Sequence, residues 1–265
     1  MFLSLVQNEW MKAYYRNKFI VFCLVISGLI GIGAVLTTLF NNYDFGAEEP
    51  VESISALEFT VSALEATSIF VLVFSVVILI SSIASEFKSG TMKQLLIRPV
   101  SRTNILVSKW VMTFLATIMI LIGVALVSLI IGSIFFGSDT PFVETISALG
   151  LWILYNLPMF FFFQTLGLFI AVLTRSTALS VAAVIVLNFV GGVITMFLLR
   201  FEWSKYLITA NLSLQDYSQN EHLFFGGTPL MENMTLGFSL TIIAVYSIVL
   251  LLIAHLVFSK KDVLS

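Results

Sequence analysis

Long uninterrupted runs of apolar residues alternate with short polar segments along this chain of 265 residues. A helix needs about 20 apolar residues to cross the hydrocarbon core of a bilayer, and several of these runs reach that length. The predicted spans are residues 19–40, 66–85, 110–136, 148–173, 177–199 and 236–258. The fourth contains Pro158, which removes one helical hydrogen bond and is expected to kink the span. The pattern therefore predicts an all-α integral membrane protein with six transmembrane helices.

The first 18 residues follow a different pattern. Apolar and aromatic residues recur there at helical spacing, with polar and charged residues between them. The apolar set is Leu3, Val6, Trp10, Met11 and Tyr14. Trp, Tyr and Lys favour the headgroup zone, so we expect residues 1–18 to form a cytoplasmic amphipathic helix at the inner membrane interface. The other interpretation is a short soluble helix that packs on the protein's own loops. The six-span domain then covers residues 19–265.

Composition agrees with the membrane prediction. Hydrophobic residues make up 59% of the chain and charged residues 11%, with a mean hydropathy of +1.05. An ordinary soluble domain has about 25% charged residues, so a soluble globule and a disordered chain are both excluded. A net charge of −2 argues against nucleic acid as a partner. The single cysteine, Cys23, has no second cysteine for an internal disulfide.

Basic residues indicate the orientation of the spans, because short basic loops stay cytoplasmic. Of the 13 Lys and Arg residues, Arg200 and Lys205 alone fall on one side of the predicted spans. The other side holds Lys12, Arg16, Lys18, Lys88, Lys93, Arg98, Arg102, Lys109, Arg175, Lys260 and Lys261. We therefore expect both termini to be cytoplasmic, which agrees with an even number of spans.

The predicted spans contain no Asp, Glu, Lys or Arg, and their one titratable candidate is His255. Proton- or sodium-coupled carriers usually keep an ionisable group at membrane depth, and a membrane enzyme needs a catalytic constellation. We therefore expect neither a coupled carrier nor an enzyme, and no metal site. The sequence has no Gly-Lys pair, so it lacks the phosphate-binding GxxxxGK[ST] loop. If ATP drives this protein, a separate subunit must bind the ATP.

The segment between the second and third spans, residues 85–109, is predicted to hold a short amphipathic cytoplasmic helix. Its apolar residues, Phe87, Met92, Leu95 and Leu96, can share one helical face, and Pro99 ends the helix. Such a helix can dock into a groove on a soluble partner. It can equally lie flat on the inner leaflet, attracted by its basic residues. The pattern alone leaves both interpretations open.

A series of positions in this segment reads Glu86, Gly90-Thr91, Leu95-Leu96, Pro99-Val100-Ser101-Arg102, Ile105 and Lys109. This series resembles the signature of ABC type-2 permeases. The six spans, the N-terminal helix and the cytoplasmic tail resemble the small permeases of bacitracin, lantibiotic and phenol-soluble-modulin exporters. The last outer loop, residues 200–235, is longer than that subgroup leads one to expect.

The resemblance implies a mechanism. Two permease chains, identical or paralogous, would pair above two cytoplasmic ABC ATPase subunits, which bind the ATP and Mg, so that this chain binds no cofactor itself. The helix between the second and third spans would be the coupling helix that receives the push of the ATPase. The residues that this role assigns are Glu86, Phe87, Gly90, Thr91, Met92, Leu95, Leu96 and Arg102.

Some polar and aromatic residues in the fourth and fifth spans are candidates for a substrate path. They are Tyr155, Asn156, Phe160, Phe163, Gln164 and Asn188. Asn and Gln are costly in hydrocarbon and are expected to face protein or a cavity. Simple helix packing is the favoured interpretation of these residues, and cargo contact is the alternative. The outer loop 200–235 is expected either to cap the exit or to form a solvated face.

We therefore expect a permease subunit of an ATP-driven exporter in a bacterial plasma membrane. Membrane lipid is an expected partner, and nucleic acid is not. The resemblance implies a lipophilic or amphipathic cargo, such as an antimicrobial or cytolytic peptide. A lipid, a glycan or a drug is an alternative cargo. The rival function is a membrane anchor or sensor for a cytoplasmic partner, which transports nothing.

Overall fold

The computed structural model describes residues 2–15, 17–42, 54–88, 102–137, 140–223, 229–231 and 234–260. All regular structure in these residues is helical. The α-helices are α1 (Phe2–Tyr14), α2 (Lys18–Asn42), α3 (Ala56–Lys88), α5 (Arg102–Phe136), α6 (Phe142–Thr174), α7 (Thr177–Leu198) and α8 (Leu236–Lys260). Within the described residues, all of these except α1 are long and apolar enough to cross a membrane, which makes six candidate spans. The predicted all-helical fold with six spans is confirmed.

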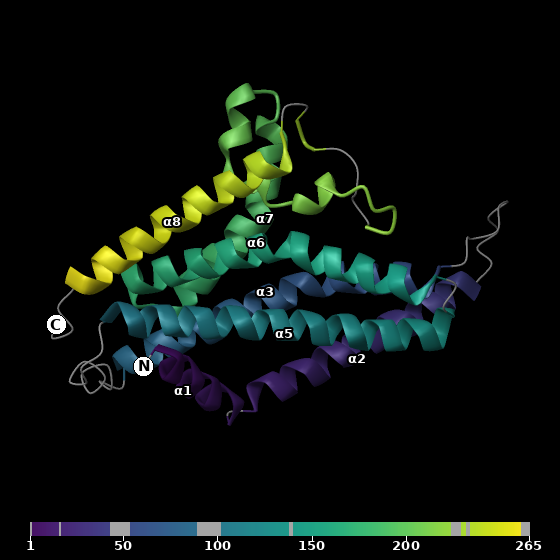
Figure 1. Ribbon diagram of the computed structural model, residues 1–265, viewed down its shortest axis with the longest axis horizontal. Helices are drawn as coiled ribbons and strands as arrows, with labels where there is room; N and C mark the ends of the chain where they lie inside the picture. The colour runs from purple at the N-terminus through teal and green to yellow at the C-terminus, as the bar shows by residue number, and fades with distance from the viewer. Residues whose placement is uncertain are drawn as a thin grey trace.

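The helices form a bundle whose two ends are distinct (Figure 1). Helices α3, α5 and α6 run along the long axis, while α2, α7 and α8 are inclined to them. The start of α1, the end of α3, the start of α5 and the end of α8 all lie at one end of the bundle. We call it the terminal end. The start of the first described helix and the end of the last therefore lie on the same side of the six candidate spans.

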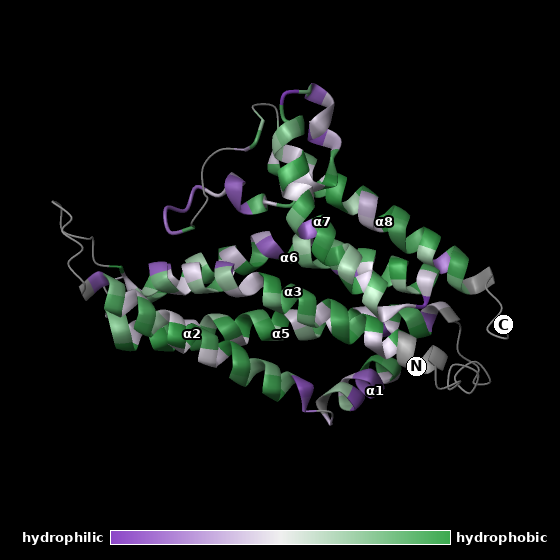
Figure 2. Ribbon diagram, turned by 180° about the vertical axis from the view of Figure 1, so that it is seen from behind, coloured by the Kyte–Doolittle hydropathy of each residue, from purple (hydrophilic) through white to green (hydrophobic). Residues whose placement is uncertain are grey.

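Hydropathy follows this arrangement (Figure 2). Hydrophobic residues dominate the six long helices, and hydrophilic residues gather on α1 and in the segment between α7 and α8. Many apolar side chains on the long helices are exposed, including Leu24, Leu126, Phe189 and Leu252. A soluble protein buries such side chains, whereas a membrane protein presents them to lipid tails.

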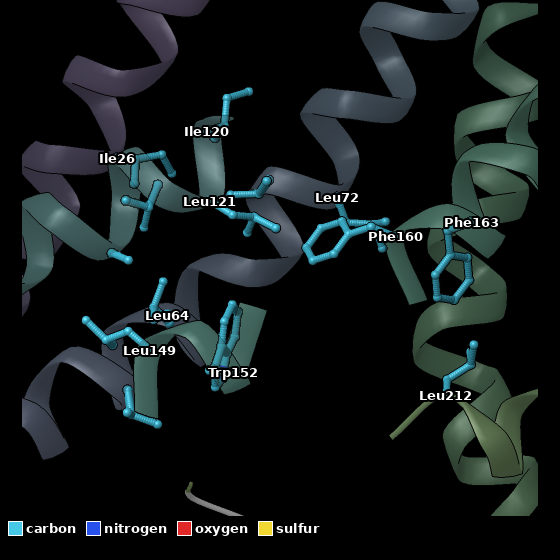
Figure 3. Close-up of a cluster of buried hydrophobic side chains, with 14 of the residues drawn as sticks. Ile26, Leu64, Leu72, Ile120, Leu121, Leu149, Trp152, Phe160, Phe163 and Leu212 are labelled. Atoms are coloured by element: carbon cyan, nitrogen blue, oxygen red, sulfur yellow. The ribbon is translucent and has the colours of Figure 1, made fainter. Parts of the chain in front are cut away.

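The centre of the bundle is a buried hydrophobic cluster to which α3 and α6 contribute many large side chains (Figure 3). Leu64 and Leu72 come from α3, and Trp152 and Phe160 from α6. Glycine permits a close approach of α5 to the start of α3, because a Cβ on Gly132 would lie 2.9 Å from the Ala56 carbonyl oxygen. Small residues at helix contacts are typical of packing inside membranes.

Helix α3 begins at Ala56, well before the predicted residue 66. A capping box starts it: the Ser55 hydroxyl accepts from the Glu58 amide at 3.2 Å, and the Glu58 carboxylate accepts from the Ser55 amide at 2.8 Å. As a result, Glu65 lies inside the candidate span Ala56–Ile83. Lys109 likewise lies inside the candidate span Thr103–Phe136. The longer candidate spans of the structure therefore include charged residues that the shorter predicted spans leave out, and each of these two side chains has a partner on another helix.

Helices α6 and α7 are joined by a tight turn. Arg175 has a φ of 55°, the left-handed conformation common after a helix end, and its amide donates to the Ala171 carbonyl. Ser176 then caps α7 by accepting from the Leu179 amide. The turn needs no further residues, so α7 follows α6 directly.

Three 3-10 helices lie between α7 and α8: η1 (Glu202–Tyr206), η2 (Ile208–Asn211) and η3 (Leu214–Tyr217). We call residues 202–218 the cap. Ile208, Asn211 and Leu214 are buried in it, while Trp203 and Tyr206 are exposed. The cap is therefore a packed structure with one exposed side rather than a wholly solvated loop.

Candidate functional site

The predicted coupling residues lie largely outside the described part of the chain. Glu86 and Phe87 are in the last turn of α3 and Arg102 is the first residue of α5, but none of these three side chains is described. Gly90, Thr91, Met92, Leu95 and Leu96 fall outside the described residues altogether. The two helix ends that flank this connection lie at the terminal end of the bundle (Figure 1).

The base of α5 carries a buried ion pair. The Lys109 ammonium donates to the Glu9 carboxylate of α1 at 2.7 Å, and Lys109 is only 2% exposed. The second oxygen of Glu9 accepts from Lys12 at 2.7 Å. Burial alone raises the pKa of Glu9, but the charges and hydrogen bonds of Lys109 and Lys12 outweigh it and hold the pKa below its ordinary value. Glu9 is therefore ionised at neutral pH and neutralises a buried ammonium.

Helix α1 is held by apolar contacts as well. Trp10 stacks on Phe19 of α2 with ring centroids 6.4 Å apart, and Phe19 in turn meets Phe74 of α3 edge-on at 5.8 Å. Leu3 and Tyr15, each 80% exposed, face away from the bundle. One side of α1 thus carries the charged and aromatic contacts to the spans, and the other side is open.

The first turn of α5 also contacts the last turns of α8. The Thr103 hydroxyl and the His255 Nδ1 lie 3.1 Å apart, at hydrogen-bond distance. Together with the Lys109 pair, this bond connects the start of α5 to α1 and to α8. The first turns of α5 are thus bonded to two further helices.

A polar contact joins α5 to α6 deep in the bundle. The Gln164 amide nitrogen donates to the Thr117 hydroxyl at 2.7 Å, and both side chains are wholly buried. The Gln164 carbonyl oxygen has no hydrogen-bond partner. A buried acceptor without a donor costs about 1–3 kcal/mol, so this contact stabilises the pair of helices only weakly.

The candidate substrate-path residues differ in how deeply they are buried. Phe160, Phe163 and Gln164 are wholly buried, and the two phenylalanines belong to the hydrophobic core (Figure 3). Asn156 is buried and Tyr155 half-buried, while Asn188 lies half-buried on α7. Phe160, Phe163 and Gln164 are thus part of the packed interior, and Tyr155 and Asn188 lie nearer its surface.

Sequence reasoning missed a polar cluster where α3, α6 and η3 meet. The Trp152 indole donates to the Glu65 carboxylate at 2.7 Å. The Asn156 amide donates to the Trp152 carbonyl at 2.9 Å and to the Gln215 side chain at 3.3 Å. The signal that points to Glu65 is the motif Ser55-Ala-Leu-Glu58, a capping box that starts the helix early and carries Glu65 into the span.

Asp216 follows Gln215 in η3. It is half-buried, and burial together with the negative charge of Glu65 raises its pKa to about 6. No group of three or more His, Cys, Asp and Glu side chains in the described part of the chain is placed to hold a metal ion.

Hydrogen bonds connect the cap to both neighbouring helices. The Asn211 amide donates to the Lys205 and Leu207 carbonyls, and its oxygen accepts from Ser239 of α8 at 2.8 Å. Thr209 of η2 is hydrogen-bonded to Thr195 of α7 through their hydroxyls. The cap therefore joins α7 to α8.

These features define the class: an all-helical, multi-pass membrane protein with a buried ion pair at its terminal end and a packed cap between α7 and α8. The chain belongs to the family described as protein of unknown function (DUF2705), which matches residues 20–264.

Two relatives come from Bacillus subtilis (strain 168). The chain is 32% identical over 206 residues to the uncharacterized protein YhcI, a match that covers 72% of this chain and 64% of YhcI. It thus spans less than two thirds of the length of that relative. It is 28% identical over 198 residues to the uncharacterized membrane protein YdbK, with 71% of this chain and 76% of YdbK covered.

Proposed function

We propose that this chain is the permease subunit of an ATP-driven ABC exporter of the type-2 class. It pairs with a second permease chain, a copy of itself or a paralogue, and takes its energy from a separate cytoplasmic ATPase. The cargo is lipophilic or amphipathic, with an antimicrobial or cytolytic peptide as the leading candidate. The support comes from the resemblance of residues 86–109 to the permease signature and from the six candidate spans.

The observation that carries the proposal is the way the base of α5 is held. The connection of residues 89–101 is followed by the first turns of α5, which are bonded to α8 through Thr103 and to α1 through Lys109. Lys109 is also the last residue of the permease-like signature. A push on the connection would move α5 together with α1 and α8, because a helix transmits force along its axis and the ion pair resists separation. Such a linkage is what an ATPase-driven permease requires.

Orientation is part of the proposal. The terminal end faces the cytoplasm of a bacterium. Most Lys and Arg residues lie in the segments that precede, connect or follow the spans at this end, and such basic segments stay cytoplasmic. In this orientation α1 is an interface helix on the inner leaflet. Its exposed Leu3, Met11 and Tyr15 suit the lipid boundary, and its half-exposed Lys12 suits the headgroups.

The test is recovery of an ATPase with the tagged chain from its native membrane in a gentle detergent, identified by mass spectrometry. Leu95→Asp places a charge on the predicted docking face and is expected to abolish recovery of the ATPase. The matched control is Leu230→Asp, because Leu230 is an exposed leucine near the cap, away from the terminal end. Wild type and the control are expected to recover the ATPase equally.

The anchor or sensor function predicts a different pattern. In that case no ATPase accompanies the well-folded wild type. The basic residues of the connection then matter most, because they hold it to anionic lipid. Lys88→Gln with Lys93→Gln would release the connection from anionic vesicles, and Leu95→Asp would have little effect. That set of results would overturn the exporter proposal.

A further inference from the structure

Aromatic side chains are exposed on the segment that follows α7. Trp203 and Tyr206 of η1 are each 53% exposed, and Phe201, the residue before η1, is 39% exposed. The rings of Phe201 and Trp203 stack with their centroids 5.9 Å apart. These three rings therefore form a surface rather than part of the hydrophobic core. We call residues 200–206 the aromatic segment.

The aromatic segment lies at the level where two candidate spans end. It begins two residues after Leu198, the last residue of α7. Tyr206 meets Phe238, in the first turn of α8, edge-on at 5.8 Å, and the Tyr206 carbonyl accepts from the Tyr246 hydroxyl at 3.2 Å. The end of α8 lies at the terminal end of the bundle, so its first turn lies on the opposite side (Figure 1). The segment thus lies where α7 leaves the bilayer and α8 enters it.

Two side chains of the aromatic segment hold a cation over a ring. The Arg200 guanidinium lies 4.9 Å from the centroid of Phe201, and the Lys205 ammonium lies 5.4 Å from the centroid of Tyr206. Among the described residues, neither cation takes part in an ion pair. Glu202 is the one acid of the segment, which therefore carries a net positive charge. Both cations thus keep N–H donors for an anion from outside the described chain.

A phospholipid has the chemistry that this surface fits. Trp and Tyr rings favour the boundary between headgroups and acyl chains, because one end of the ring is apolar and the other polar. Guanidinium and ammonium groups bind phosphate through charge-assisted hydrogen bonds. The exposed Met196 and Phe197 of α7 come directly before the segment, so the lipid-facing surface of that span continues onto it.

We propose that the aromatic segment lies in the bilayer interface opposite the terminal end and binds an anionic phospholipid there. The rings of Phe201, Trp203 and Tyr206 pack against the glycerol and the first methylenes of the lipid. Arg200 and Lys205 bind its phosphate, and the net positive charge favours an anionic over a zwitterionic headgroup. The site belongs to this chain alone and does not depend on the proposed ATPase.

Quenching of tryptophan fluorescence by brominated lipid tests this site in the full-length chain, purified and placed in lipid nanodiscs. The discs hold equal amounts of phosphatidylglycerol and phosphatidylcholine, with bromine on the acyl chains of one lipid or of the other. The difference between wild type and Trp203→Phe isolates the signal of Trp203 from those of Trp10, Trp110 and Trp152. Iodide in the water measures the exposure of Trp203 to solvent.

Trp203 is expected to be quenched by brominated lipid and protected from iodide. A basic residue near an anionic surface contributes about a fivefold preference, and Glu202 offsets part of the effect of the two cations. Brominated phosphatidylglycerol should therefore quench Trp203 about fivefold more effectively than brominated phosphatidylcholine. Arg200→Gln with Lys205→Gln should make the two lipids equal, whereas Arg200→Lys with Lys205→Arg should keep the preference.

Two further variants separate a phosphate site from a change in folding. Glu202→Gln adds to the net positive charge without removing a cation, so the preference for phosphatidylglycerol should rise. Glu221→Gln is the matched control, because Glu221 is an exposed carboxylate outside the aromatic segment, and it should leave the preference unchanged.

Three outcomes overturn the proposal. Quenching of Trp203 by iodide and by neither lipid would show a solvated segment. Protection from both kinds of quencher would show that protein covers the segment. Equal quenching by the two brominated lipids, in wild type and in Glu202→Gln, would show a lipid-facing segment without a phosphate site.

Discussion

The buried ion pair between α1 and α5 makes an asymmetric prediction about stability. Lys109 is 2% exposed, and Glu9→Gln removes the carboxylate that neutralises it. Removing one partner of a buried ion pair costs about 3–5 kcal/mol. We expect about 3 kcal/mol, because Glu9 lies at the rim, where water can reach the site. For a chain of this size the midpoint of thermal unfolding then falls by about 6–12 °C.

Replacement of Lys109, the other partner of the ion pair, should lower the stability less. In Lys109→Met the Glu9 carboxylate keeps its contact with Lys12, and the methionine fills the space of the lysine stem. We expect a loss of about 1 kcal/mol, and the double variant Glu9→Gln with Lys109→Met should recover most of the stability of wild type, as when a buried pair is replaced by neutral groups.

Thermal unfolding of the purified protein in one detergent measures all three variants. Lys12→Gln is the matched control, because that partner is half-exposed and its contact is worth less than about 1 kcal/mol. The reasoning is refuted if Glu9→Gln is no less stable than Lys12→Gln, or if the double-mutant cycle gives a coupling below about 0.5 kcal/mol.

Three further predictions concern acid, helix contact and the bundle interior. The pKa of Glu9 is lowered, so its stabilisation is complete above its ordinary value of 4.5 and is lost as the pH falls below it; acid unfolding of Lys109→Met should show a weaker dependence in this window. Gly132→Ala presses a Cβ on the Ala56 carbonyl and should cost about 1–3 kcal/mol, whereas Gly123→Ala on the same helix meets nothing and should be neutral or stabilising in thermal unfolding. Gln164→Leu loses one interhelical bond and one unpaired acceptor, so it should change stability by less than about 1 kcal/mol; a loss above about 3 kcal/mol would mean that the carbonyl oxygen has a partner in the membrane.

Hydrophobic run length predicted the six spans because each must be apolar over the thickness of the bilayer. It misplaced the start of the second span, because the helix begins before the apolar run does. Helix α3 extends through Glu58 and Glu65, since the capping box starts it and Trp152 satisfies Glu65. A prediction from run length ends each span at a charged residue, because run length carries no information on partners that lie far away in sequence.

The contacts of the candidate site were beyond sequence reasoning for the same reason. The resemblance indicated Lys109 as part of a signature, but Glu9 stands 100 residues earlier and gave no sign of its role. The packing of the cap was likewise left open, because its burial depends on Asn211 and Ser239, which come together only when α8 folds back. Local pattern predicts elements, while long-range pairs of polar groups require coordinates.

The contacts between the cap and α8 impose an order on how the protein is made. Ser239 satisfies the oxygen of Asn211 and also contacts the hydroxyl of Tyr217, so two polar groups of the cap depend on one residue near the start of the last helix. During synthesis the cap is translated before α8 and has no partner until α8 emerges from the ribosome. When α7 enters the membrane, the cap that follows it therefore still lacks its hydrogen-bond partner on α8. The last helix therefore completes the packing of the cap, because Ser239 supplies the partner of Asn211 and Tyr217.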